Sequence, residues 1–385
     1  MKEYYFDNSA TTKMSERARA KMLDVIDNFH GNPSSLHAKG LSSEKIISEA
    51  RGIILSSLGI LRAQRGELVF TSGGTESNNL AIFGTVYAKA RKGNEKILIT
   101  KGEHSSVEEC ARCLEKRGFT VIRVPTKNGV LDLEFIRNNA KDVILASFMH
   151  VNNETGALYN LKEAFEIVKE QSPNAIAHAD CVQSYLKVKL TKKSLGADLI
   201  SISSHKVNGA KGVGALYISP ELLKAKKIIN TVYGGGQEFG IRSGTENVYG
   251  IASFGEAVKE HMESLPREIE RMEALRAYII NGLSPQIRPN LPKSHAPHIL
   301  NVTMPRIRSE IVLHDLSARG IYISSGSACS SHSASKVSQA LVAFGISEEE
   351  ADTSIRISLC PSNTEAEADV LINALNDAVN RLARK

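Results

Sequence analysis

One lysine stands where an amine could do covalent chemistry. Lys206 follows the apolar run Leu199–Ser203 in the segment Ser203-Ser204-His205-Lys206. Open α/β sheets bind their ligands at the carboxyl ends of strands, and a lysine in that place can lose its proton and form a Schiff base with an aldehyde. The alternative is a solvated surface lysine, which is the commoner case for a lysine taken alone.

An aspartate and a histidine also follow apolar runs. Asp180 ends the run Ala177-His178-Ala179-Asp180, where a carboxylate can keep a pyridinium nitrogen protonated and so make the ring an electron sink. His104 follows the run Lys96–Thr100 and could stack on an aromatic cofactor. Either side chain could instead cap a helix, which is a frequent use of polar residues after a strand.

Small residues at 72–75 (Ser-Gly-Gly-Thr) follow the predicted strand Leu68–Thr71 and precede a helix predicted over Glu76–Ala90. Unpaired N–H groups at such a helix start favour an anion such as a phosphate. An ordinary strand-to-helix turn with a Ser or Thr cap explains the same residues. The segment is not a P-loop, because the Gly-x-x-x-x-Gly-Lys spacing is absent.

Cys329 and Arg356 are the remaining candidates. Cys329 lies in the segment Ser324–Ser335, in which eight of twelve residues are Ser or Gly. That composition predicts a surface loop, whereas free cysteine is normally buried, so a nucleophilic thiol is favoured over an incidental one.

Arg356 lies in the alternating segment Ser354–Ser358. Its guanidinium could bind a carboxylate, or it could be an ordinary surface arginine.

The composition is that of a folded globular chain. The 385 residues, 42% hydrophobic and 23% charged, predict about two domains. The formal charge of +6 and the absence of long like-charge blocks argue against a nucleic-acid partner, and no apolar run is long enough to span a membrane. Five cysteines without metal-ligand spacing predict a reducing cytoplasm, no disulfide framework and no metal site.

These candidates must be positioned by a sheet. Short apolar runs alternate with helix-like stretches up to about residue 255, which predicts a mostly parallel, doubly wound α/β sheet. Further helices are predicted over 106–117 and 160–171. A smaller α+β domain is predicted after that, with a long helix over Gly255–Leu283 and a strand at Ile321–Ser324. The seven predicted strands of the large sheet are Leu68–Thr71, Lys96–Thr100, Val121–Pro125, Val143–Phe148, Ala175–Ala179, Leu199–Ser203 and Gly214–Ser219.

Taken together and in this order, the segments resemble pyridoxal-phosphate enzymes of the aminotransferase class V superfamily, and within it cysteine desulfurases of the NifS/IscS type. The resemblance implies fold type I, with a large cofactor-binding domain over 14–255. A small domain formed by 1–13 and 256–385 would carry the cysteine loop. The matching segments are residues 6–12, 31–35, 71–79, 150–156, 203–206, 242–247 and 325–330, together with Asp180 and Gln183.

The resemblance also assigns roles to matching positions. Lys206 would bind pyridoxal 5'-phosphate and move the α-proton of the substrate, and Cys329 would be the nucleophile. Asn32 and Arg356 would bind the substrate carboxylate. Contacts to the cofactor are implied for Gly74, Thr75, His104, Asn153, Asp180, Gln183, Ser203, His205 and, from a neighbouring subunit, Thr245.

The implied activity is removal of sulfur from L-cysteine by a cytoplasmic homodimer, giving L-alanine and a persulfide on Cys329. The sulfur would pass to an acceptor protein, such as an iron–sulfur scaffold or a tRNA-thiolation enzyme. Two alternatives stay open: a selenocysteine or cystine lyase, which would not need Cys329, and a non-catalytic sulfur-transfer docking platform. The chain departs from the family pattern at Cys360-Pro361 and at Gln237-Glu238-Phe239, which affects the exit of a strand and the details of a subunit contact.

Overall fold

The computed structural model describes residues 2–62, 66–89, 93, 95–325 and 337–382. Its largest sheet has seven strands in the order β2-β10-β9-β8-β7-β3-β4. All neighbours pair in parallel except β10, which is antiparallel to both β2 and β9. The predicted mostly parallel seven-stranded sheet is therefore confirmed. The strands are β2 (Leu68–Thr71), β3 (Lys96–Thr100), β4 (Thr120–Val124), β7 (Val143–Met149), β8 (Ile176–Asp180), β9 (Leu199–Ser203) and β10 (Gly214–Ile218).

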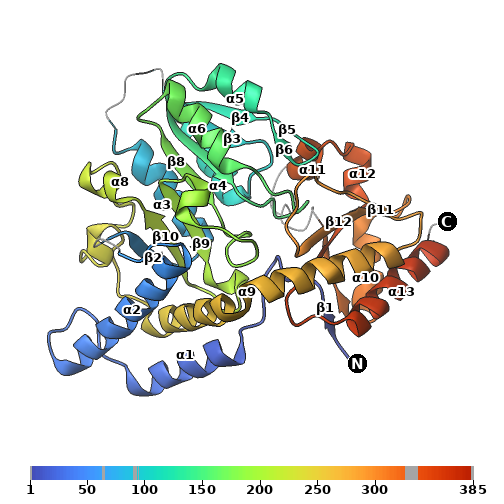
Figure 1. The fold of residues 1–385 in the computed structure, drawn as a ribbon, viewed down its shortest axis with the longest axis horizontal. Coiled ribbons are helices and arrows are strands. Elements are labelled where there is room, and N and C mark those ends of the chain that lie inside the picture. Colours follow the sequence, from blue (N-terminus) through green and yellow to red (C-terminus); the bar gives the residue numbers. More distant parts are fainter. Residues whose placement is uncertain (1, 63–65, 90–92, 94, 326–336, 383–385) are drawn as a thin grey trace.

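Helices cover both faces of this sheet (Figure 1). In β3, Leu98 packs into one hydrophobic cluster while Ile97 and Ile99 pack into another, as the alternation of side chains along a strand requires. This two-sided burial explains why the strands appear in the sequence as continuous apolar runs. One cluster includes α3 (Gly74–Val86) and α4 (Ser105–Lys116); the other includes α2 (Ala38–Ser57), α6 (Leu161–Gln171) and the first part of α9 (Val248–Gly282).

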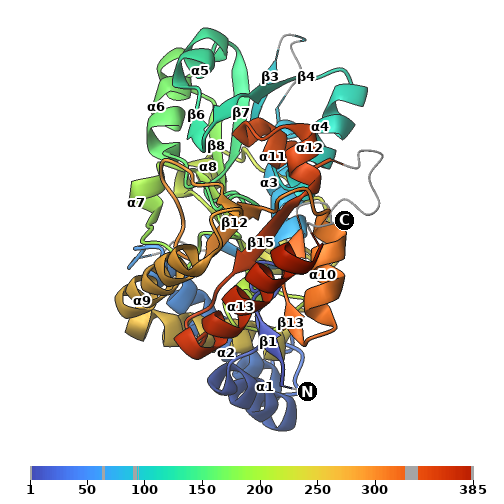
Figure 2. The same cartoon turned by 90° about the vertical axis from the view of Figure 1, so that its right-hand side faces the viewer.

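A second, antiparallel sheet lies beside the first, in the order β11-β12-β15-β14. Figure 2 shows α13 crossing in front of β15, and both contribute to a separate hydrophobic cluster. The elements of this part are β11 (Arg288–Pro289), β12 (Ile299–Thr303), α10 (Ser309–Ser317), β13 (Ile321–Tyr322), β14 (Ser324–Ser325), α11 (Gln339–Phe344), α12 (Glu348–Asp352), β15 (Ser354–Ser358) and α13 (Glu365–Leu382).

The N-terminal strand pairs with the far end of the chain. β1 (Tyr4–Tyr5) runs parallel to β13, so the two N-terminal tyrosines lie beside Ile321 and Tyr322. The remaining elements are α1 (Glu16–Asn28), β5 (Thr126–Lys127), β6 (Val130–Leu131), α5 (Leu133–Asn139), α7 (Lys192–Leu195), α8 (Pro220–Lys224) and the 3-10 turns η1 (Ser204–Lys206) and η2 (Glu238–Gly240). The predicted division into 14–255 and the rest stays a prediction.

Three elements differ from their predicted bounds by more than one residue at an end or in their pairing, and several others differ by one residue. The helix predicted from Gly255 begins at Val248, because the Asn247 side chain accepts a hydrogen bond from Gly250 N and caps the helix there. The strand predicted over Ile321–Ser324 is divided between two sheets, since β13 pairs with β1 and β14 pairs with β15. The helix predicted over Glu76–Ala90 begins at Gly74 and ends at Val86.

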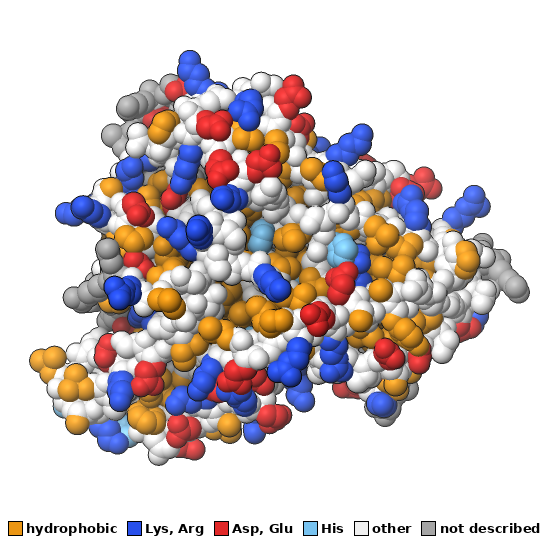
Figure 3. Space-filling view, in the orientation of Figure 1, with side chains coloured by type: hydrophobic (Ala, Val, Ile, Leu, Met, Phe, Trp, Pro, Cys, Tyr) orange, Lys and Arg blue, Asp and Glu red, His pale blue; other side chains and the backbone are white. Residues whose placement is uncertain are grey.

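The surface carries charges of both signs. Figure 3 shows Lys and Arg side chains intermingled with Asp and Glu over one face of the molecule. Within the described ranges, the apolar stretches of the helices are too short or too charged for any of them to cross a membrane.

Candidate active site

A cavity of about 330 Å³ lies where β7, β8 and β9 end and where α3 and α4 begin. Ligands of open α/β sheets bind at this edge, and the volume is that of a small-molecule site. Ten residues with predicted roles line it: Gly74, Thr75, His104, Asn153, Asp180, Gln183, Ser203, His205, Lys206 and Arg356. The sequence pattern had assigned no role to the other lining residues, which are Ser9, Ala10, Asn78, Ser106, Met149, Val151 and Val182.

Two described residues with predicted roles are not brought to this cavity. Thr245 lines a separate hollow of about 120 Å³ together with Arg242. Asn32 is exposed in a turn, where its Oδ1 accepts from Ser34 N at 2.9 Å. Cys329 lies outside the described residues.

Lys206 is held at the cavity wall by the N-terminal segment of the chain. It ends the 3-10 turn that follows β9, and its Nζ donates to the carbonyl oxygens of Ser9 at 2.5 Å and Ala10 at 2.8 Å. The Nε2 of Gln183 donates to the same Ser9 oxygen at 2.9 Å. A segment nearly 200 residues earlier in the chain therefore positions the amine.

Asp180 is the last residue of β8 and is almost completely buried. Each carboxylate oxygen already has one donor: Val182 N donates to Oδ1 at 2.9 Å, and Asn78 Nδ2 donates to Oδ2 at 2.7 Å. Donors on both oxygens fix the orientation of the carboxylate and stabilise its negative charge.

His104 is the N-cap of α4 and also lines the cavity. Capping a helix and facing the cavity were given as alternatives for this residue, and it does both. Its Nδ1 accepts from Ser106 N at 3.1 Å. Burial lowers the pKa of His104; Asp180 opposes this shift and Lys206 adds to it. The ring is therefore neutral near pH 7, with its proton on Nε2.

The start of α3 offers an anion site. Within the described part of the chain, no side chain caps this helix at Gly73, so N–H groups of its first turn remain available to an anion. A Cβ atom at Gly74 would lie 2.6 Å from Val182 Cγ2, so only glycine fits there. The buried Ser203 hydroxyl has no partner among the described residues. Burial, with Lys206 and Lys211 nearby, lowers the pKa of His205 to about 4.

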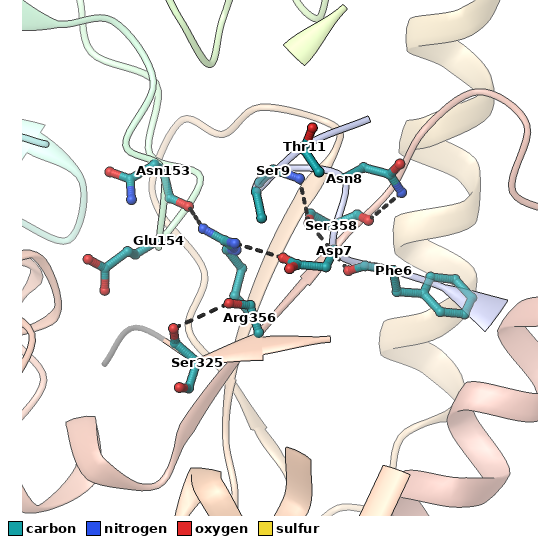
Figure 4. A network of polar contacts seen from close by, with 12 residues as sticks. Phe6, Asp7, Asn8, Ser9, Thr11, Asn153, Glu154, Ser325, Arg356 and Ser358 are labelled. Carbon is teal, nitrogen blue, oxygen red and sulfur yellow. Dashed lines mark hydrogen bonds and ion pairs between the residues drawn. The ribbon is translucent and has the colours of Figure 1, made fainter. Parts of the chain in front are cut away.

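Arg356 lies in β15 at the opposite wall of the cavity and is 2% exposed. Its Nη1 donates to the carbonyl oxygen of Asn153 and its Nη2 to Oδ1 of Asp7, both at 2.8 Å (Figure 4). The buried Nε has no partner among the described residues. The guanidinium is therefore fixed from two sides and keeps donor capacity for a carboxylate.

Two half-buried glutamates next to these residues have no predicted role. Burial raises the pKa of Glu103 to about 8, although Thr100 Oγ1 and Met149 N donate to its Oε1. Burial also raises the pKa of Glu154 to about 7, although Ser338 Oγ donates to its Oε2. Glu154 lies in the matching segment 150–156, but that match assigns it no role, and no local sequence signal marks Glu103. The environment of both side chains comes from the tertiary fold.

Comparisons with known proteins agree with this geometry. The chain is 39% identical over 382 residues to cysteine desulfurase IscS of Clostridium botulinum, which covers 97% of this chain and 94% of that protein. It is 37% identical over 383 residues to cysteine desulfurase IscS 1 of Archaeoglobus fulgidus, covering 98% and 97%.

Two solved structures are similar over almost the whole chain. A NifS-like protein superposes with a TM-score of 0.91 at 32% identity, covering 99% of this chain and 100% of that one. A structure described as SspA in complex with cysteine has a TM-score of 0.81 at 30% identity, covering 94% and 100%. The aminotransferase class-V family model matches residues 4–371. The chain therefore belongs to the aminotransferase class-V family.

Proposed function

We propose that this chain is a cysteine desulfurase that uses pyridoxal 5'-phosphate. The observation that carries the proposal is the cavity that unites the amine of Lys206 with Asp180 and His104, opposite Arg356. Relatives at 37–39% identity over nearly the full length bear the name cysteine desulfurase, which supports this reaction over others of the same family.

The lining residues fit the cofactor. The uncapped start of α3 and the unpartnered Ser203 hydroxyl suit its phosphate. Asp180 suits the ring nitrogen, His104 suits a ring face, and Lys206 suits the aldehyde carbon. Asn153 and Gln183 would contact the ring hydroxyl. When bound, pyridoxal phosphate supplies a ring that takes up the electrons released at the α-carbon of an amino acid.

The chain's own residues then bind and orient L-cysteine. Arg356 receives the substrate carboxylate through its remaining N–H groups, since Asp7 and Asn153 already fix its plane. Lys206 acts as the base that removes the α-proton. The neutral ring of His104 holds a proton on Nε2 that it can donate.

Cys329 is the sulfur acceptor in this proposal. Its thiolate attacks the substrate sulfur, so that an S–S bond forms while the C–S bond of the substrate breaks. The substrate carbon takes up a proton, and the products are L-alanine and a persulfide on Cys329. The sum of atoms is unchanged, because one thiol and one L-cysteine give one persulfide and one L-alanine.

The proposal includes a cytoplasmic homodimer that passes sulfur to an acceptor protein. Support for the dimer comes from Thr245, which lines a hollow apart from the main cavity and would serve the site of a second copy. The acceptor would be an iron–sulfur scaffold or a tRNA-thiolation enzyme.

The function is tested by incubating the cofactor-loaded protein with L-cysteine and a reductant, and by measuring L-alanine and sulfide. The two products should form in equal amounts. Lys206→Ala should abolish both, whereas the exposed Lys45→Ala should change neither. Sulfide release without L-alanine would contradict the proposal.

A further inference from the structure

A single asparagine joins two residues of the site. Asn78 lies near the start of α3, is fully buried and lines the cavity. Its Nδ2 donates to Oδ2 of Asp180 at 2.7 Å and to Oγ of Ser106 at 2.8 Å. The Ser106 hydroxyl oxygen lies 2.8 Å from Nδ1 of His104. One amide nitrogen is thus connected to the carboxylate directly and to the imidazole through a hydroxyl group.

The chemistry of the partners fixes the direction of each bond. A carboxylate oxygen accepts hydrogen bonds, so the NH₂ end of Asn78 must face Asp180. The second N–H of that nitrogen then points at Ser106 Oγ, which accepts it and has its own proton left to donate. His104 Nδ1 accepts from Ser106 N at 3.1 Å and so carries no proton. The Ser106 hydroxyl therefore donates to Nδ1.

We propose that Asn78 is a positioning residue that, through the Ser106 hydroxyl, reinforces the Nε2–H form of His104 that the Ser106 backbone N–H also favours, and that also holds the Asp180 carboxylate. The inference deepens the proposed function and rests on it for its purpose. The directed chain of donors leaves His104 with a proton on Nε2, so the imidazole can donate there. It also fixes His104 and Asp180 relative to one another. These are the two residues that would contact the plane and the nitrogen of the cofactor ring.

Asn78→Asp tests this arrangement, because it keeps the shape of the side chain and replaces its donor by an acceptor. The new carboxyl group shares one proton with Asp180, because two buried carboxylates this close do not both ionise. It has no proton left for Ser106, so the Ser106 hydroxyl would donate to it and turn a lone pair toward His104. In nitrogen NMR of the cofactor-free protein with labelled histidine, the Nδ1 signal of His104 should move from the unprotonated toward the protonated range. His104→Gln identifies the signal. An unchanged Nδ1 signal in folded Asn78→Asp would overturn the proposal.

Three further variants show whether the effect travels through the hydroxyl. Ser106→Ala keeps the backbone N–H donor, so Nδ1 of His104 should stay unprotonated. The double variant Ser106→Ala with Asn78→Asp should move the Nδ1 signal little. An equal movement without the hydroxyl would contradict the relay. Asn79→Asp is the matched control, since among the described residues Asn79 Nδ2 bonds the Thr75 carbonyl alone, and it should leave the signal in place. If Asn78→Asp does not fold, Asn78→Ala is the second test. It removes the donor that orients the Ser106 hydroxyl, which can then rotate and present a lone pair to Nδ1 part of the time. The signal should move partway toward the protonated range, and no movement would overturn the proposal.

The NMR test of Asn78 can succeed or fail independently of the test of the desulfurase proposal, because the spectra need neither cofactor nor substrate. If the Nδ1 signal is the same in Asn78→Asp as in the wild-type protein, Asn78 does not have this role, and the desulfurase proposal is unaffected. A shifted signal in a protein that never forms L-alanine from L-cysteine supports the positioning role and contradicts the desulfurase proposal alone.

Discussion

Arg356 and Asp7, which are 349 residues apart in the chain, form an ion pair with 2.8 Å between Nη2 and Oδ1. The arginine side chain is 3% exposed and the aspartate side chain 21% exposed, so the pair is largely shielded from solvent. It joins the N-terminal segment to β15 at the wall of the cavity. Asp7 therefore neutralises and orients the residue that would receive the substrate carboxylate.

Removing Asp7 should leave a buried guanidinium without its counter-ion. We expect Asp7→Ala to lower the free energy of unfolding by about 2 kcal/mol and to raise the KM for L-cysteine more than it lowers kcat. Asp7→Asn keeps an acceptor at the same place and should show less than half of each effect. Denaturant unfolding and initial rates check this, and equal losses in both variants would show that only the charge matters.

Replacing the guanidinium itself should weaken substrate binding. Arg356→Lys keeps the positive charge but loses the planar fork, so we expect the KM for L-cysteine to rise by roughly 10- to 100-fold with a smaller change in kcat. Arg271→Lys, which replaces a donor to the Asn363 carbonyl outside the cavity, serves as the control. An Arg356→Lys enzyme with an unchanged KM would remove the carboxylate-binding role.

The half-buried acid Glu103 should make stability depend on pH. Folding raises its pKa from 4.5 to about 8, so between these values the folded state binds more protons than the unfolded state, and stability falls as pH rises. Glu103→Gln cannot ionise. Its free energy of unfolding relative to wild type should therefore rise by roughly 4 kcal/mol between pH 5 and pH 8.5.

Denaturant unfolding at several pH values measures this difference. The exposed Glu109→Gln is the matched control and should show no such trend. If the free energies of unfolding of the wild type and of Glu103→Gln differ by the same amount at every pH, Glu103 is ionised in the folded protein.

The close packing at Gly74 should be intolerant of a methyl group. Because a Cβ there would lie 2.6 Å from Val182 Cγ2, Gly74→Ala should cost about 1–3 kcal/mol of stability and weaken pyridoxal phosphate binding. Gly52 in α2 has no atom within 4 Å of an added Cβ, so Gly52→Ala should gain about 0.5–1 kcal/mol with unchanged affinity. Unfolding of the cofactor-free protein and a cofactor titration check both variants.

The large sheet could be predicted from the sequence because its strands are buried on both faces and appear as apolar runs. Helix α1 could not, since only Ala18 and Val25 are buried along its length and the apolar stripe is correspondingly weak. The division of 321–325 between two sheets was also missed, because a two-residue strand such as β14 has no periodicity of its own. Its pairing with β15 depends on the tertiary fold.

Within the site, residues that follow strands could be predicted, because strand ends converge at one edge of the sheet. Lys206, Asp180 and His104 are of this kind and line one cavity. The roles of Ser9 and Asp7 could not, since they depend on contacts with Lys206 and Arg356, about 200 and 350 positions away. Asn78 was visible in the matching segment, but its bonds to Asp180 and Ser106 depend on how α3 packs beside β8 and α4.

The central claim is that an amine at the edge of the sheet releases sulfur from L-cysteine onto Cys329. Peptide mass spectrometry after incubation of the cofactor-loaded protein with sulfur-labelled L-cysteine tests it most directly. We expect a gain of one labelled sulfur atom on the peptide that contains Cys329, and no gain in Lys206→Ala. Label on another cysteine peptide, or an equal gain on Cys329 without the lysine, would contradict it.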